Sequence, residues 1–139
     1  MIVIVVTARP SYARVKTVLE GLRVRQLPFI VVAAASALLD KYGRVVDVMR
    51  DDQWPCVEIP AVCEGSSLLT GVLTTAHLTD ALGRYFAVLS PQLILTIADR
   101  RETLATAIAA SYQHIPLLHL LADEHSGSID EKIRGAVSQ

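Results

Sequence analysis

The sequence predicts an α/β protein with a doubly wound, mainly parallel sheet and helices on both faces. Short continuous runs of apolar, often β-branched residues, such as "MIVIVVTA" at residues 1–8, are typical of strands buried on both faces. These runs alternate along the chain with longer segments of helical periodicity. That alternation is the pattern of a parallel sheet whose strands are connected by helices.

The first half of the chain contains three predicted strands. After the opening run, Pro10 suits a first helical turn, and the apolar residues that follow have helical spacing. Residues 29–36, "FIVVAAAS", predict a second strand, and "CVEIP" at 56–60 a short third one. Between them we expect a short helix, a break at Gly43 and a second helical piece. The apolar positions of the first helix are Tyr12, Val15, Val18, Leu19 and Leu22.

The second half continues the alternation. A long helix is predicted from Ser66 to about Leu89, and it should end there because the residue before Pro91 disfavours helical backbone. We then expect a strand in "LILTIA", a helix in "RETLATAIAASYQ", a strand in "IPLLHLL" and a last helix beginning near Ile129. Small side chains should let the helix after residue 100 pack closely, namely Ala105, Ala109 and Ala110.

Length and composition favour one folded domain over residues 1–139. Apolar residues make up 52% and charged residues 19%, and the formal net charge is -1. This balance disfavours a nucleic-acid partner, which requires a basic surface. The opening apolar run reaches Arg9 too soon for a transmembrane helix or a signal peptide. We therefore expect a cytoplasmic protein that does not associate with membranes.

Cysteine spacing gives no support for a metal or a disulfide framework. Cys56 and Cys63 are seven residues apart, and the chain has no C-x-x-C pair. We expect two reduced, partly buried thiols. No His, Asp or Glu set has the spacing of a dedicated metal site, so we expect no metal and no cofactor.

Three loops are expected at the carboxyl ends of the strands, where doubly wound sheets bind ligands. The loop "TARPSY" at 7–12 contains Arg9, and "ADRRET" at 98–103 contains Asp99 directly after a buried strand. The third, "HLLADEHSGSIDEKIR" at 119–134, contains several carboxylates. An arginine and these carboxylates are predicted to share one crevice. The acidic residues of the third loop are Glu124, Asp130 and Glu131.

Each of these residues also has a purely structural interpretation. Asp99 could be the N-cap of the following helix. Asp130 and Glu131 suit the first turn of the last helix, where the positive end of the dipole attracts carboxylates. Arg9 could be a surface charge, and His119 a hydrogen-bonded core histidine. Their common location at loop ends favours function.

Four motifs resemble one family over nearly the whole chain. "TARPSYARVKTVL" resembles a G-T-R-P opening, "VVAAASALLDKYGRVVDVM" the second strand and helix, and "TIADRRETLATAIAA" a G-D-R-x-E motif. "HLLADEHSGSIDEKIRGA" resembles H-x-x-G-G-E-x-x-G-S-I-D-E-x-x-R-H-A. Together they resemble the N-terminal domain of the hydrolysing UDP-N-acetylglucosamine 2-epimerases, enzymes of sialic-acid and capsule-precursor synthesis.

The resemblance implies one half of a glycosyltransferase-B-type fold, in which two Rossmann-like domains enclose a UDP-sugar. Such enzymes convert UDP-N-acetylglucosamine and water to N-acetylmannosamine and UDP. The C2 proton is removed, UDP is eliminated, and water adds to the resulting glycal. This chemistry needs groups that accept and donate protons. The family's acid/base carboxylates match Asp99, Glu124, and Asp130 or Glu131, and the implied substrate-binding residues are Arg9, Arg100, His119, Ser128 and Arg134.

The chain also departs from the family pattern. Ala122 and Asp123 replace two glycines, and Asp123 adds negative charge beside Glu124. Ala8 replaces a glycine, Arg101 a tyrosine and Gly135 a histidine.

Family members are more than twice this length, and their C-terminal UDP-binding domain is absent from residues 1–139. The isolated chain is therefore expected to be inactive, with a second Rossmann-like domain or chain as its partner. The alternative is a truncated, non-catalytic relative that serves as a sugar-nucleotide binding or protein-interaction module. Apolar surface left bare where the second domain would dock could also produce a homo-oligomer.

Overall fold

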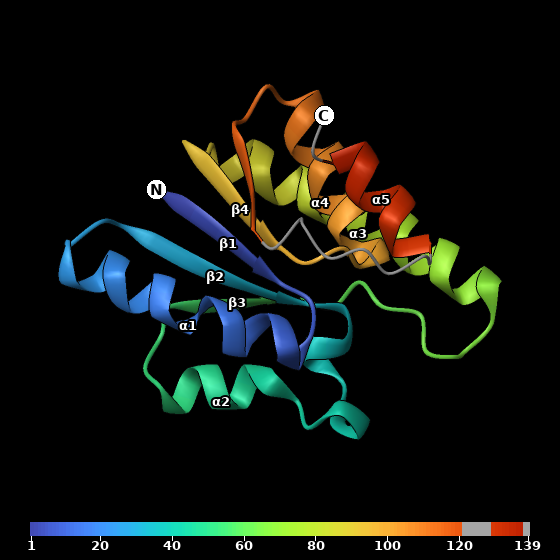
Figure 1. The fold of residues 1–139 in the computed structure, drawn as a ribbon, viewed down its shortest axis with the longest axis horizontal. Coiled ribbons are helices and arrows are strands. Elements are labelled where there is room, and N and C mark those ends of the chain that lie inside the picture. The colour runs from blue at the N-terminus through green and yellow to red at the C-terminus, as the bar shows by residue number, and fades with distance from the viewer. Residues whose placement is uncertain (121–128, 138–139) are drawn as a thin grey trace.

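The computed structural model describes residues 1–120 and 129–137, and it confirms the predicted parallel sheet. The strands lie in the order β3-β2-β1-β4-β5, and every neighbouring pair is parallel (Figure 1). Val3 of β1 is in register with Ile30 of β2 on one side and Ile94 of β4 on the other. The strands are β1 Ile2–Val6, β2 Phe29–Ala34, β3 Cys56–Ile59, β4 Leu93–Ile97 and β5 Leu117–Leu120.

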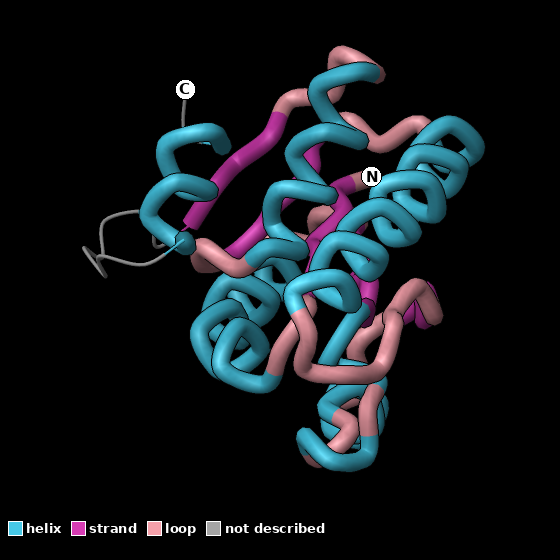
Figure 2. Tube along the Cα trace, turned by 90° about the vertical axis from the view of Figure 1, so that its right-hand side faces the viewer, coloured by secondary structure: helices cyan, strands magenta, loops and turns pink. Residues whose placement is uncertain are grey.

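Helices cover both faces of the sheet, as the alternating pattern predicts (Figure 2). Successive residues of a strand point to opposite faces. Ile4 and Val6 of β1 therefore pack with helices α1 and α2, whereas Val3 and Val5 pack with α3 and α4. Helix α5 packs beside α4. The helices are α1 Arg9–Val24, α2 Val45–Asp51, α3 Leu68–Leu89, α4 Arg101–Tyr112 and α5 Ile129–Val137.

The predicted element boundaries hold with one refinement. The short helix expected after the second strand is two 3-10 turns, η1 Ala35–Leu38 and η2 Asp40–Tyr42. Gly43 ends the second turn with a φ of 75°, a backbone conformation that glycine adopts without steric cost. The long helix α3 begins after Ser67, whose side chain accepts a hydrogen bond from the Thr70 N–H at 3.1 Å.

Small side chains allow α4 to pack closely against the neighbouring elements. Ala105, Ala109 and Ala110 are buried between α4 and its neighbours, so α3 and α4 lie close together as expected. At the far end, the Gln113 side-chain amide donates to the Gly83 carbonyl at 2.8 Å. These contacts hold α4 against α3 along its length.

On the opposite face, a polar cluster joins α1 to the end of α2. The Tyr12 hydroxyl donates to the Asp52 carboxylate, Lys16 Nζ lies 2.9 Å from the same oxygen, and Trp54 Nε1 donates to the Tyr12 oxygen at 2.9 Å. The hydrogen bonds from Tyr12 and Lys16 lower the pKa of Asp52, and burial raises the pKa of Tyr12 above its usual range.

Both cysteines are reduced and half-buried, as predicted. Among residues 1–120 and 129–137, no helix has the length and apolarity needed to cross a membrane. Within the same ranges, no cluster of three or more His, Cys, Asp or Glu side chains is arranged to hold a metal ion.

Candidate functional site

The site lies at the carboxyl edge of the sheet, between β1 and β4. The chain leaves β1 toward β2 on one side, and β4 leads to β5 on the other, so the strand order reverses here. Ligands of doubly wound sheets bind at such a switch point. The Thr7 carbonyl after β1 accepts hydrogen bonds from Ser36 Oγ at 2.8 Å and the Ala37 N–H at 3.1 Å. These bonds tie the first loop to the segment after β2.

Ala98, directly after β4, has a left-handed backbone with a φ of 65°. Non-glycine residues seldom adopt this conformation, and surrounding contacts must hold it in place. Its N–H donates to the Leu120 carbonyl at 3.0 Å. Its carbonyl accepts from Thr103 Oγ1 at 3.0 Å and lies 2.8 Å from His119 Nε2. Because a carbonyl only accepts, Nε2 of His119 carries a hydrogen.

The structure brings Asp99 and His119 together. Nε2 of His119 lies 3.4 Å from Asp99 Oδ1, and the two side chains are only 7% and 11% exposed, respectively. The N-cap interpretation of Asp99 is wrong, because Arg100 occupies the N-cap position of α4. A carboxylate and an imidazole in contact, shielded from water at a loop end, can exchange protons with a ligand.

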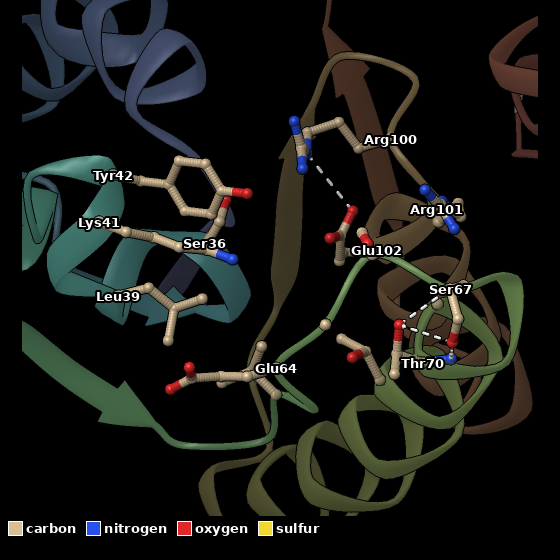
Figure 3. Close-up of a pocket in the computed structure, with 15 residues that line it drawn as sticks. Ser36, Leu39, Lys41, Tyr42, Glu64, Ser67, Thr70, Arg100, Arg101 and Glu102 are labelled. Carbon is tan, nitrogen blue, oxygen red and sulfur yellow. Dashed lines mark hydrogen bonds and ion pairs between the residues drawn. The ribbon is translucent and has the colours of Figure 1, made fainter.

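A polar pocket of about 140 Å³ begins at Arg100, the residue after Asp99, and neither Asp99 nor His119 lines it. Its walls come from the segments after β2, β3 and β4, so one pocket joins three loops that are distant in sequence. Figure 3 shows Lys41 and Tyr42 on one side, with Arg100, Arg101 and Glu102 on the other. Hydroxyl groups supply much of the remaining lining, namely those of Ser36, Ser66, Ser67, Thr70 and Thr74.

Two arginines form the basic wall of the pocket. Arg100 Nε lies 3.4 Å from Glu102 Oε2, and the Arg100 side chain is 44% exposed. Arg101 lies over Gly71 of α3, where an added Cβ would come within 2.1 Å of Arg101 Nη1. Glycine at position 71 therefore allows the guanidinium to lie directly on the helix.

The electrostatic character of the pocket favours a negatively charged ligand. Both α3 and α4 begin at the pocket, and the positive ends of helix dipoles attract anions. Lys41, Arg100 and Arg101 add three cationic groups against the carboxylates of Glu64 and Glu102. Arginine side chains are well suited to bidentate contacts with phosphate or carboxylate.

The other predicted site residues are distributed differently. Arg9, the exposed first residue of α1, lies over Gly43, where an added Cβ would be 2.7 Å from Arg9 Nη1. It does not line the pocket, whereas Arg100 does. Glu124 and Ser128 lie outside the described residues. The backbones of three others belong to α5, but their side chains are also outside the description: Asp130, Glu131 and Arg134.

Sequence reasoning did not identify Lys41, Tyr42 or Thr70 as site residues. Two signals could have pointed to the pocket. Gly71 interrupts an otherwise good helical pattern, and such a glycine often permits close packing. Ser67, two residues after Gly65, is a helix N-cap beside a turn.

The parallel sheet and its switch point define a Rossmann-like α/β domain. The sequence profile of the family described as UDP-N-acetylglucosamine 2-epimerase matches residues 31–139. This chain belongs to that family.

Individual relatives agree with this assignment. The chain is 30% identical to the UDP-N,N'-diacetylbacillosamine 2-epimerase (hydrolyzing) of Legionella pneumophila over 140 residues, which cover 99% of this chain and 37% of that protein. It is 24% identical to the polysialic acid biosynthesis protein P7 of Escherichia coli, with 99% and 36% covered. The chain thus spans little more than a third of the length of these relatives.

Solved structures share the fold. The UDP-GlcNAc 2-epimerase of Neisseria meningitidis, bound to UDP-GlcNAc, matches with a TM-score of 0.80 at 18% identity, covering 99% of this chain and 38% of that one. The enzyme of Methanocaldococcus jannaschii matches with a TM-score of 0.75 at 14% identity, covering 98% and 37%. The fold is therefore that of one half of a glycosyltransferase-B-type enzyme, as the sequence predicted.

Proposed function

We propose that this chain is the N-terminal domain of a hydrolysing UDP-N-acetylglucosamine 2-epimerase, and that it supplies proton-transfer groups to a cleft completed by a second Rossmann-like domain. The contact between Asp99 and His119 at the switch point carries the proposal. Asp99 follows β4 and His119 lies within β5, and the parallel pairing of these strands brings the two side chains within 3.4 Å.

The proposed reaction requires one proton to be removed from C2, one proton to be delivered to C2, and UDP to leave as an anion. A base takes the C2 proton, the bond from C1 to the UDP oxygen breaks, and a double bond forms between C1 and C2. Water then adds its hydroxyl to C1 while C2 receives a proton on the other face. Asp99 is one proton-transfer group, held in place beside the N–H of His119. Glu124, Asp130 and Glu131 are the other carboxylates proposed for these steps.

The polar pocket that begins at Arg100 suits the charged part of the substrate. Lys41, Arg100 and Arg101 are placed to attract the diphosphate and to stabilise UDP as it departs. Hydroxyl groups such as Thr70 are suited to sugar hydroxyls. Closure by a second domain would exclude water and position the substrate, so the chain alone should bind UDP-sugars weakly.

Binding can be tested by nuclear magnetic resonance on the isolated, isotope-labelled chain. UDP-N-acetylglucosamine should shift the amide signals of residues around Asp99, Arg100 and Lys41, and N-acetylglucosamine without the nucleotide should shift them less. An absence of shifts at millimolar ligand, or equal shifts with any mononucleotide, would contradict the proposed site.

The second candidate is a non-catalytic sugar-nucleotide binding or interaction module. The replacement of two glycines by Ala122 and Asp123 favours it, because the additional carboxylate beside Glu124 repels a diphosphate. A two-domain assembly that joins this chain to the C-terminal part of a family enzyme separates the candidates. UDP release supports the enzyme, whereas binding without turnover supports the module.

A further inference from the structure

A thiol and an imidazole lie together away from Asp99, where β3 leads into α3. Cys63 Sγ is 3.5 Å from His77 Nδ1, a distance compatible with a hydrogen bond to sulfur. Cys63 is half-buried in the loop after β3, and His77 is exposed on α3. Reagents in solution can therefore reach the pair. Nothing in the proposed epimerase chemistry uses either residue.

The backbone around Cys63 is fixed to the helix that carries His77. The side-chain oxygen of Thr74 accepts from the Cys63 N–H at 2.9 Å and donates to the Cys63 carbonyl at 3.4 Å. Thr74 is buried, with 6% of its surface exposed, and precedes His77 by three residues on α3. Positions three apart on a helix are neighbours on its surface. Two hydrogen bonds between Thr74 and the Cys63 backbone thus hold the thiol near the imidazole of His77.

We propose that Cys63 is a covalent modification site that reacts with low-molecular-weight disulfides, with His77 as the base. A thiolate is the attacking form of cysteine, and an adjacent imidazole can take the thiol proton. The Cys63 sulfur attacks one sulfur of the disulfide, a new S–S bond forms, and the old S–S bond breaks. The departing thiolate receives the proton from His77, so no other oxidant or reductant is needed.

Modification at Cys63 would change the wall of the polar pocket. Val62 and Glu64, the residues on either side of Cys63, both line the pocket, and so does Thr74. Cys63 itself does not line the pocket, so a group attached there would act on the pocket through its neighbours Val62 and Glu64. Reaction at Cys63 is independent of the epimerase reaction, because it involves only Cys63, His77 and the residues that hold them.

Cys56 provides an internal reference in the same chain. It is also half-buried and reduced, but it lies on β3 and packs against the apolar core beside α1 and α2. Because both rates are measured in one molecule, their ratio removes differences in protein and reagent concentration between samples.

The test treats the purified chain with 2,2'-dithiodipyridine for varied times and locates the label on each cysteine by peptide mass spectrometry. We expect Cys63 to react faster than Cys56, and His77→Asn to lower the ratio of the Cys63 rate to the Cys56 rate by about tenfold or more. His114→Asn is the matched control, because His114 is an exposed histidine in the turn before β5, and it should leave the ratio unchanged. Equal rates for the two cysteines, or an unchanged ratio in His77→Asn, would overturn the proposal.

Discussion

Two aspartates, Asp52 and Asp99, have opposite surroundings. Asp52 accepts hydrogen bonds from Tyr12 and Lys16, and its side chain is 28% exposed. Asp99 lies at the carboxyl edge of the sheet, 11% exposed, beside the imidazole of His119. The first carboxylate is matched by a cation and a hydroxyl, which makes it a structural joint between helices. The second is buried next to a group that can itself exchange a proton.

These surroundings suggest different roles for the two aspartates, stability for Asp52 and proton transfer for Asp99. A carboxylate held by a cation is stabilised in its charged form and is a poor candidate for proton transfer near neutral pH. A shielded carboxylate at a switch point is placed where ligands bind. We therefore expect changes at Asp52 to affect unfolding and changes at Asp99 to affect turnover.

The largest effect is expected for Asp99→Asn in a two-domain assembly with the C-terminal part of a family enzyme. The amide keeps the shape of the side chain but cannot accept the proton, so the rate of UDP release should fall by about 10²–10⁴-fold. Glu131→Gln is expected to abolish turnover in the same way.

Asp52→Asn in the same assembly is the control for both variants. It should retain the rate of UDP release, and circular dichroism should show that all three variants are folded. Unchanged turnover in both Asp99→Asn and Glu131→Gln would refute the proposed proton-transfer roles.

Tyr12→Phe is expected to have the largest effect on stability. It conserves volume but leaves the buried Trp54 N–H without its acceptor and removes a donor from Asp52. An unsatisfied buried donor costs about 1–3 kcal/mol, and the free energy of unfolding should fall by that amount. Urea unfolding followed by tryptophan fluorescence measures this change.

Tyr112→Phe is the matched control for that measurement, because Tyr112 is exposed at the end of α4 and should tolerate the change. Equal stability of the two variants would show that the Tyr12 hydroxyl contributes nothing to the fold.

The fold was predictable because its signals are local. Apolar runs such as residues 2–6 identify buried strands, and Pro91 identifies the end of α3. Asp99 and His119 could also be predicted as site residues. Each lies at or near the end of a predicted buried strand, and parallel strands end at the same edge of the sheet.

The pocket was not predictable in the same way. Lys41 and Arg101 line one pocket although they are 60 positions apart in sequence, and this depends on how α3 crosses α4 and on the 3-10 turns after β2. Gly71 shows the difficulty, because its role depends on the Arg101 side chain that lies over it. No pattern in a single sequence specifies such a crossing.

Gly71→Ala is expected to lower ligand affinity without lowering the stability of the fold. The added methyl group meets the end of the flexible Arg101 side chain, which can move away from α3. Alanine is a better helix former than glycine by about 1 kcal/mol, so unfolding should become no easier. Ligand affinity should fall because Arg101 leaves its place in the pocket, and the amide shifts caused by UDP-N-acetylglucosamine report that loss.

The matched control is Gly83→Ala, also within α3 but outside the pocket, where the nearest side-chain atom to an added Cβ is 3.8 Å away. It should leave the ligand-induced shifts unchanged. Equal ligand affinity in Gly71→Ala and the unmodified chain would remove Arg101 from the proposed binding surface.

The smallest effect concerns the pH dependence of stability at Asp52. Hydrogen bonds from Tyr12 and Lys16 to the charged form hold the pKa of Asp52 in the folded state below its usual range. The unfolded chain therefore takes up the proton at higher pH than the folded chain does. The stability that this carboxylate contributes is complete above the unfolded pKa and is lost as the pH falls through the folded pKa.

Urea unfolding between neutral pH and about pH 3 should show a shallower loss of stability in Asp52→Asn than in the unmodified chain. Asp51→Asn, at the adjacent exposed position, should follow the unmodified chain. Identical pH profiles for Asp52→Asn and Asp51→Asn would mean that the Asp52 contacts are not maintained in solution, and the contrast with Asp99 would then rest on turnover alone.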